Sequence, residues 1–323
     1  MFEKLIASLK ANPRKIVFTE GTDPRILEAA ARLLEDTFLA PVLVGNEEAV
    51  HAAAKDAGFK IDGAVIVDPE KYENMEAMVE KMVQLRKGKM TAEQCRDLLK
   101  KGNYFGTMLV AMGEADALLG GATYSTADTV RPALQLVKTK PGNKIVSSCF
   151  IMVRPSDNTS LAMADCAINI KPSEDELVEV AAETIKCARM FGIDPKVAFL
   201  SYSTKGSGAG EDVDKMRNAC AKAKELMPDE AIDGEMQFDA AVSPTVGQLK
   251  FPGSKVAGYA NTFIFPDINA GNIGYKIAQR LGGFDAYGPI LLGLNAPIND
   301  LSRGCNADEV YSMAIITAAQ ANA

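Results

Sequence analysis

Short apolar runs alternate with longer amphipathic stretches along most of the chain. The apolar runs predict buried strands at residues 15–19, 41–44, 64–67, 117–119, 144–153, 166–170, 196–202, 256–265 and 290–294. Apolar residues that recur every three or four positions predict helices at residues 24–38, 47–57, 72–87, 92–101, 174–191, 211–226, 270–281 and 307–321. This alternation indicates an α/β fold with a largely parallel sheet, in which ligands bind where loops leave the carboxyl ends of strands.

Two candidate linkers divide the chain of 323 residues, a length that suggests about two domains. One is the charged Pro-Gly turn KTKPGNK at residues 138–144, and the other is NAPIN at residues 295–299. We therefore predict a first domain of residues 1–141 plus 296–323 and a second domain of residues 142–295. In this division the last helix returns to the first domain.

Composition and charge narrow the classes of function. The net charge of −7 disfavours non-specific binding to nucleic acid or to an anionic membrane. Six cysteines without a CxxC pair indicate reduced thiols. Neither a signal peptide nor an apolar run of about 20 residues is visible. We therefore expect a cytoplasmic protein. His51 is the only histidine, so we expect no histidine-based metal site, and acid/base work falls to a carboxylate.

Three segments carry signals for the start of a helix. In TEGTDPR, Asp23 suits the N-cap and Pro24 the first helical position. In FPDINAGNIGY, Asn269 is expected to cap the helix that follows. In NDLSRGCNADEVYSM, Asn306 is followed three positions later by Glu309, which is the pattern of a capping box.

The segment GGATYSTADTVRP, residues 120–132, combines hydroxyl groups with a guanidinium after a strand. A helix N-terminus with Arg131 beside it would hold a phosphate group, but a capped helix with a surface arginine explains the same residues. Both interpretations stay open, and Pro132 is expected to kink the helix. The hydroxyl groups belong to Tyr124, Ser125, Thr126 and Thr129.

Two more loops are candidates for contact with an anion or substrate. The Gly-rich loop SYSTKGSGAG does not have the Walker A pattern. It is either a flexible loop without a functional role or a loop in which Lys205 and Ser207 contact an anion. Helix capping does not explain Asn272. In the last segment, Ser302 and Arg303 form a polar turn just before a helix N-terminus, where a hydroxyl and a guanidinium would clamp an anion.

Four long motifs together resemble the phosphate acetyltransferase (phosphotransacetylase) group of the phosphate acetyl/butyryltransferase family. They are GGATYSTADTVRPALQ, STKGSGAGEDVDK, FPDINAGNIGYK and GPILLGLNAPINDLSRGCNADEVY. The resemblance runs from VFTEGTDPRILEAA to ITAAQA. It implies reversible acetyl transfer between acetyl phosphate and coenzyme A, giving acetyl-CoA and phosphate, with no metal or redox cofactor. It also implies a homodimer of chains with two α/β/α domains, an active-site cleft between the domains, and an architecture similar to the isocitrate and isopropylmalate dehydrogenases.

The resemblance also implies roles for particular residues. The serine and arginine of the LSRG motif are Ser302 and Arg303, which would stabilise the acyl phosphate and its developing oxyanion. Arg131 of the STADxxRP motif would contact the substrate anion. A further arginine at the end of an earlier helix corresponds to Arg86, with Arg96 as the alternative.

The carboxylate that takes the thiol proton is less firmly placed. The family position, seven residues after the serine, holds Glu309, and Asp308 precedes it, so the usual Glu-Asp order is inverted. Either carboxylate remains a candidate. Leu292 stands where many members have a glutamine, which removes one polar group.

Three other functions compete with acetyl transfer. Phosphate butyryltransferase activity differs only in the depth of the acyl pocket. A non-catalytic relative would bind acyl phosphates without turnover, although the cluster of Ser302, Arg303, Arg131 and a carboxylate argues against it. A decarboxylating dehydrogenase is disfavoured because no dinucleotide fingerprint or metal-carboxylate cluster is visible.

Overall fold

A computed structural model describes residues 2–322, which divide into two compact units. One unit contains the chain up to Pro141 together with the segment from Leu294 onward, and the other contains Gly142–Gly293. The second division thus falls two residues before the position predicted from NAPIN. Among the described residues, no helix has the length and apolar character that a membrane span requires.

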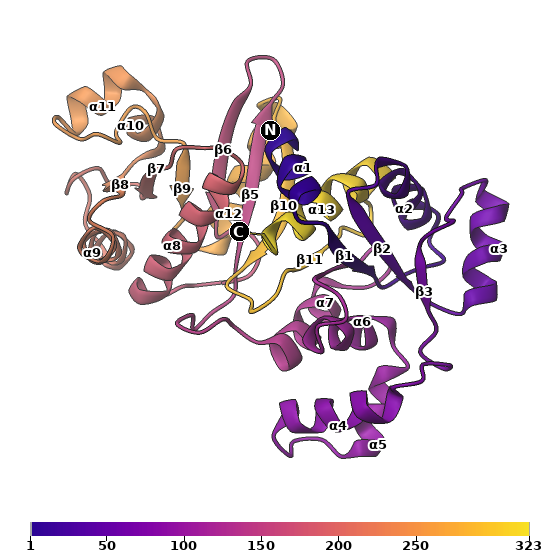
Figure 1. Cartoon of the computed structure of the whole chain (residues 1–323). Coiled ribbons are helices and arrows are strands. Elements are labelled where there is room, and N and C mark those ends of the chain that lie inside the picture. Colours follow the sequence, from indigo (N-terminus) through magenta and orange to yellow (C-terminus); the bar gives the residue numbers. More distant parts are fainter. Residues whose placement is uncertain (1, 323) are drawn as a thin grey trace. The chain divides into compact units, whose positions relative to one another are not determined.

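The first unit is built on a parallel sheet whose strand order, among the described residues, is β11-β4-β1-β2-β3 (Figure 1). Its strands are β1 (Arg14–Phe18), β2 (Leu39–Val44), β3 (Val65–Val67), β4 (Ala117–Gly120) and β11 (Ile298–Asp300). Helices α1 (Phe2–Ala11), α2 (Pro24–Asp36) and α13 (Ala307–Gln320) pack together on one face. Helix α3 (Glu47–Ala57) lies beside β3.

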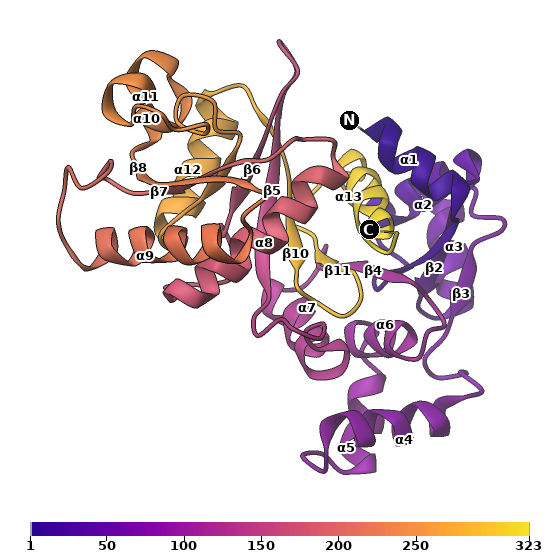
Figure 2. The same ribbon diagram turned by 60° about the vertical axis from the view of Figure 1, so that its left-hand side comes forward.

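The other face of this sheet carries α6 (Gly102–Ala111) and α7 (Thr126–Pro132), followed by a π-helix at Ala133–Val137. Helices α4 (Met75–Arg86) and α5 (Ala92–Leu99) form a further layer outside α6 (Figure 2). Met78, Phe105 and Met108 are fully buried in the core between these layers. Helix α6 is apolar on all sides, which explains why periodicity did not reveal it.

Pro132 ends α7, in agreement with the kink predicted from the sequence. Proline has no N–H to donate to the carbonyl oxygen of Asp128 four positions earlier. The side-chain amide of Asn103 in α6 donates to that oxygen instead, at 2.8 Å. The chain then widens into the π-helix, in which Lys138 N–H donates to Ala133 O at 2.8 Å.

The second unit has a mixed sheet of order β10-β5-β6-β9-β7-β8 within its described residues. Its strands are β5 (Ser147–Arg154), β6 (Thr159–Ala164), β7 (Lys196–Leu200), β8 (Ala231–Met236), β9 (Thr262–Ile264) and β10 (Asp285–Leu292). Helices α8 (Glu174–Met190) and α9 (Glu211–Leu226) cover one face, and α10 (Phe238–Val242), α11 (Pro244–Lys250) and α12 (Ile268–Leu281) lie on the other side. Strand β5 is antiparallel to both of its neighbours, β10 and β6, and the pairs β6–β9, β9–β7 and β7–β8 are parallel.

Two predictions in this unit are wrong. Residues 166–170 form no strand, because backbone N–H groups of Ala167, Ile168 and Asn169 donate to the buried carboxylate of Asp165. The strand is β6 instead, which precedes them. Helix α12 begins two residues earlier than expected: its N-cap is Asp267, which accepts from Ala270 N–H at 3.0 Å, and Asn269 lies inside the helix.

Candidate active site

Three loops leave the carboxyl ends of neighbouring strands β1, β4 and β11 in the first unit. The register aligns Phe18 with Leu119 and Leu119 with Asn299, so the residues that follow lie in one row. The loop after β1 leads to α2 on one face, whereas the loop after β4 leads to α7 on the other. Such a change of direction opens a crevice at the end of the sheet, and ligands of open α/β sheets bind there.

Glu20 joins the loops that follow β1 and β4. Its carboxylate accepts the N–H groups of Gly121 and Thr123, both at 3.1 Å, and the hydroxyl of Thr19 at 2.7 Å. Burial raises the pKa of Glu20, although these hydrogen bonds act in the opposite direction. The Tyr124 hydroxyl lies 2.7 Å from Thr19 Oγ1 and therefore belongs to the same network.

Asp300 joins the loop after β4 to the end of β11. It is 3% exposed and accepts the hydroxyls of Thr126, at 2.6 Å, and Thr129, at 2.5 Å. Burial raises the pKa of Asp300, and Glu20 adds to the increase because like charges repel. The hydroxyl hydrogens of Thr126 and Thr129 are thus used inside the protein, and Ser125 donates to Asp128 at 2.7 Å.

The predicted Ser302–Arg303 turn follows β11 directly. Cys305 N–H donates to Ser302 O at 2.9 Å, and Gly304 N–H donates to Ser302 Oγ at 3.2 Å. Both Ser302 and Arg303 are exposed. Within residues 2–322, no ion pair occupies the Arg303 guanidinium, so it is available to an anion.

Helix α13 begins with the predicted capping box, which is confirmed. Asn306 Oδ1 accepts from Glu309 N–H at 2.9 Å, and Glu309 Oε2 accepts from Asn306 N–H at 3.1 Å. Asp308 points elsewhere, because it forms an ion pair with Arg32 of α2 at 2.6 Å. Glu309 lies close enough to Cys305 to raise the pKa of that thiol, which burial raises most.

Arg86 at the end of α4 and Arg131 in α7 act on the pKa of the same phenol. Both guanidinium groups oppose the effect of burial on the pKa of Tyr104 in α6, which is raised overall. Arg86 Nε is buried and has no hydrogen-bond partner among residues 2–322. Arg96 differs from both, because Glu76 binds it at 2.6 Å on the exposed surface of α4 and α5. The pair of Arg86 and Arg131 is therefore the better candidate for an anion site.

The predicted residues of the second unit lie in well-bonded loops. The loop that carries Lys205 and Ser207 wraps around Glu235, whose carboxylate accepts from Gly206 N–H at 2.8 Å and from the Ser203 hydroxyl at 3.0 Å. Asn272 donates to Cys166 O at 3.0 Å and accepts from Lys276 at 2.9 Å. Asn272 therefore holds α12 against the loop after β6.

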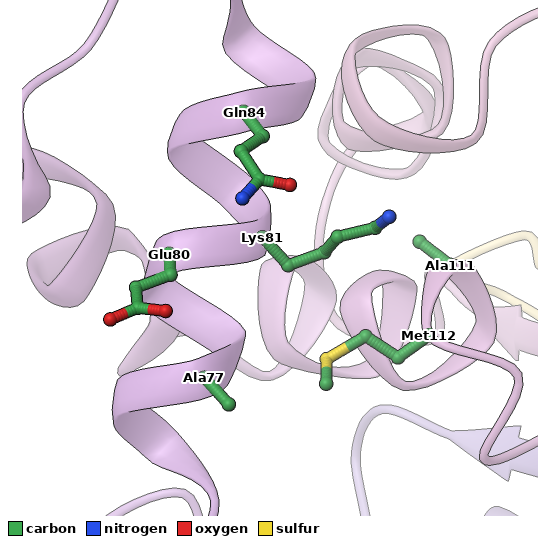
Figure 3. A pocket seen from close by; sticks show the side chains of 6 residues that line it. All are labelled: Ala77, Glu80, Lys81, Gln84, Ala111 and Met112. Carbon is green, nitrogen blue, oxygen red and sulfur yellow. The ribbon is translucent and has the colours of Figure 1, made fainter.

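A surface hollow of about 320 Å³ lies apart from these loops (Figure 3). Lys81 on α4 points across it toward the end of α6 at Ala111 and Met112, and Ala77, Glu80 and Gln84 of α4 complete the lining. Because α6 begins next to Thr19, at Gly102, its opposite end is roughly 14 Å from the row of strand ends. The hollow contains none of the predicted site residues.

Sequence reasoning did not single out Glu20, Arg25 or Asp300. Glu20 and Arg25 lie in the segment TEGTDPR that joins β1 to the first turn of α2, and Asp300 ends β11 within the last family motif, which is the available signal. Their partners lie far away along the chain, however: Asp300 and Thr126 are 174 positions apart.

The fold and this arrangement define an α/β enzyme with polar groups gathered at the carboxyl ends of parallel strands. The family model for phosphate acetyl/butaryl transferase matches residues 1–318. A phosphate acetyltransferase of Bacillus subtilis (strain 168) is 54% identical over 307 residues, which are 95% of this chain and 94% of the relative. The chain therefore belongs to the phosphate acetyl/butyryl transferase family, which confirms the resemblance seen in the motifs.

Solved structures agree with this assignment. A phosphotransacetylase from Streptococcus pyogenes superposes with a TM-score of 0.96 at 52% identity, covering 99% of this chain and 97% of that chain. The EutD phosphotransacetylase from Staphylococcus aureus gives a TM-score of 0.92 at 47% identity, covering 99% of both chains. The predicted α/β fold class is confirmed.

Proposed function

We propose that this protein transfers an acetyl group reversibly between acetyl phosphate and coenzyme A. The observation that carries the proposal is the Ser302–Arg303 turn at the end of β11, where a guanidinium without an ion pair to any described residue lies next to a hydroxyl that donates to none of them. The printed names of relatives near 50% identity over almost the whole chain support the same reaction.

Ser302 and Arg303 stabilise the charge that develops during the reaction. The Ser302 oxygen accepts from Gly304 N–H, which orients the hydroxyl and leaves its single hydrogen for a substrate oxygen. When a thiolate attacks acetyl phosphate, negative charge gathers on the former carbonyl oxygen. Donors that are fixed in advance around this oxygen lower the barrier without reorganisation.

Glu309 accepts the proton of the coenzyme A thiol, with Asp308 as the alternative. The thiol must lose its proton because the thiolate is the nucleophile. Only one oxygen of Glu309 is used in the capping box, and the residue lies beside the Ser302–Arg303 turn. Asp308 is 83% exposed and bound to Arg32 instead.

Arg131 and Arg86 bind the anionic groups of the substrates. Both guanidinium groups lower the pKa of the same phenol, and Arg86 Nε, which is buried without a partner among the described residues, gains a hydrogen bond when an anion enters. Arg131 lies in α7; Tyr124 and Ser125 shape the loop before this helix, and Thr126 and Thr129 anchor its first turn to Asp300. Lys205, Ser207 and Asn272 are proposed as further substrate contacts from the second unit.

Three wider features complete the proposal. Acetyl phosphate is already an activated acyl donor, so transfer to a thiol requires no metal or redox cofactor. The six cysteines are free and buried, which suits a reducing cytoplasm. The protein acts as a homodimer, and the exposed apolar face of α12 offers a surface for the second copy.

The decisive experiment follows the formation of acetyl-CoA from acetyl phosphate by the pure, folded protein. We expect turnover that survives dialysis against EDTA and that is faster with acetyl phosphate than with butyryl phosphate. Arg303→Gln should lower kcat by about 100-fold or more, whereas Arg96→Gln should stay close to the parent rate. Binding of acetyl phosphate without turnover would instead identify a non-catalytic relative, and equal losses in the two variants would contradict the role of Arg303.

A further inference from the structure

Arg25, in the first turn of α2, uses all of its hydrogen-bond donors inside the protein. Nε and Nη2 donate to the two oxygens of Asp23 at 3.0 and 2.8 Å, and Nη2 also donates to Ala122 O at 2.9 Å. Nη1 donates to the carbonyl oxygens of Arg303, at 2.9 Å, and Cys305, at 3.1 Å. A guanidinium has five N–H groups, so these five bonds leave none for a substrate.

The acceptors of Arg25 belong to all three loops of the candidate site. Asp23 lies after β1, Ala122 after β4, and Arg303 and Cys305 after β11. The bidentate bond to Asp23 fixes the plane of the guanidinium, and it raises the pKa of Arg25 further above its already high ordinary value. One rigid group therefore sets the separation of three loops.

This arrangement bears directly on the Ser302–Arg303 turn. Arg25 binds the carbonyl oxygens on both sides of Gly304, which fixes the backbone between Arg303 and Cys305. Arg303 itself has no ion pair within the described residues and is exposed. The two arginines are thus distinct: Arg303 is available to substrate, and Arg25 is committed to the turn that carries Arg303.

We propose that Arg25 is a positioning residue for acetyl transfer, which holds the Ser302–Arg303 turn in register with the loops after β1 and β4. The inference rests on the proposed function. A displacement of about 1 Å in a positioned group costs on the order of 100-fold in rate. Because Arg25 touches no substrate, its loss lowers kcat and leaves substrate binding almost unchanged.

Arg14 provides a matched control at the opposite end of β1. Its guanidinium also joins distant segments, since it donates to Asn322, Asp116 and Ala321. The Arg14 side chain is 30% exposed and that of Arg25 is 26% exposed. Replacement of either residue by glutamine should therefore lower the melting temperature by a similar amount.

The test measures kcat and KM for both substrates in Arg25→Gln, Arg25→Lys and Arg14→Gln. We expect kcat to fall about 100-fold in Arg25→Gln with both KM values within about threefold, and Arg14→Gln to keep the parent rate. Arg25→Lys should not restore the rate, because an ammonium has three donors and no planar fork. Added guanidinium ion should raise the rate of Arg25→Ala and leave that of Arg14→Ala unchanged.

Asp23→Asn provides a second test of the positioning role of Arg25 if the Arg25 variants fold poorly. Asparagine is an equally good N-cap, so α2 is retained while the bidentate bond to Arg25 is weakened. We expect kcat to lie between those of the parent and Arg25→Gln. Three outcomes would overturn the inference: an unchanged kcat, a tenfold rise in KM at constant kcat, or an equal rate loss in Arg14→Gln. A parent protein without acetyl transfer would overturn the proposed function itself.

Discussion

Glu309 has two roles, because it forms the capping box of α13 with Asn306 and is the proposed acceptor of the thiol proton beside the Ser302–Arg303 turn. A single isosteric substitution can separate these two roles. Glutamine serves as well as glutamate at the third position of a capping box. We expect Glu309→Gln to change the free energy of unfolding by less than about 0.5 kcal/mol. We expect kcat to fall by about 100-fold, because a proton acceptor is lost. Thermal unfolding and steady-state rates give the two quantities.

Asp308→Asn is the control for this prediction. The Asp308 carboxylate is 83% exposed, and exposed ion pairs such as that with Arg32 contribute little to stability. The variant should resemble the parent in both measurements. If Glu309→Gln keeps the full rate, or if Asp308→Asn loses it, Glu309 has only its capping role.

Glu20 makes the stability of the folded protein depend on pH in a defined direction. Burial raises the pKa of Glu20 above its ordinary value of 4.5, so the folded state binds the proton more tightly than the unfolded state. Its contribution to stability is complete below the unfolded pKa and is lost as the pH rises through the folded pKa. Glu20→Gln cannot ionise, and its amide oxygen still accepts the two N–H groups. The variant should therefore gain stability relative to the parent as the pH rises above 4.5.

Glu174 supplies a control of opposite sign. Lys222 and Asn218 lower the pKa of Glu174, so its contribution to stability is complete above its ordinary value of 4.5 and is lost as the pH falls through the lowered pKa of the folded state. Glu174→Gln should consequently lose stability relative to the parent as the pH rises toward 4.5, whereas Glu20→Gln gains stability above 4.5. Denaturant unfolding at several pH values measures both slopes. Slopes of the same sign would contradict the assignment for Glu20.

At the scale of elements, the loop between β4 and α7 is confined by the end of β11. Gly121 has a φ of +104°, and a Cβ atom there would meet the Asp300 carboxylate and lie 3.0 Å from Leu301 O. Gly113 has a φ of +77°, but a Cβ atom there would meet nothing within 4 Å. Alanine at Gly113 should cost about 1–2 kcal/mol from backbone strain alone.

We expect Gly121→Ala to cost more stability than Gly113→Ala and also to lower kcat. The added methyl group must displace either the loop or Asp300, and this movement separates α7 from the Ser302–Arg303 turn. Gly113→Ala should keep the parent rate, because that turn lies between α6 and β4, away from the strand ends. Equal losses of stability and of rate in both variants would show that crowding against Asp300 has no effect.

Local signals predicted some elements well because their causes are close in sequence. The caps at Asp23 and at Asn306 with Glu309 depend on residues two or three positions apart, and both form as expected. The pattern failed where a buried polar side chain or a distant strand decides the outcome. Residues 166–170 are apolar enough for a strand, but Asp165 takes their N–H groups. Strand β11 is short and becomes a strand only by pairing with β4.

The candidate site also combines residues that local motifs indicate with residues whose partners are distant along the chain. Family motifs indicated Ser302, Arg303 and Arg131, because these residues lie within characteristic strings. The network behind them was invisible, because Glu20, Arg25 and Asp300 bond to segments that are about 100 or more positions away. Only the return of β11 and α13 to the first unit brings those segments to one edge of the sheet.

The homodimer is a prediction about the whole molecule that one helix face makes testable. Ile273, Ile277 and Leu281 are four positions apart on α12 and are 58%, 54% and 85% exposed. Residues at this spacing share one face of a helix. A contiguous apolar stripe of this kind is typical of an interface, and in a two-fold dimer each copy presents the same stripe.

Ile277→Glu should therefore lower the molar mass in solution from that of a dimer, twice the chain mass of 34.5 kDa, to that of a single chain. Light scattering after gel filtration measures this mass. A charge at the centre of a two-fold patch is buried without a partner, and it faces its own copy. Leu226→Glu is the control, because Leu226 is 70% exposed but lies at the end of α9 without such a stripe. A monomeric parent, or equal dissociation of both variants, would contradict the assignment of α12 to the interface.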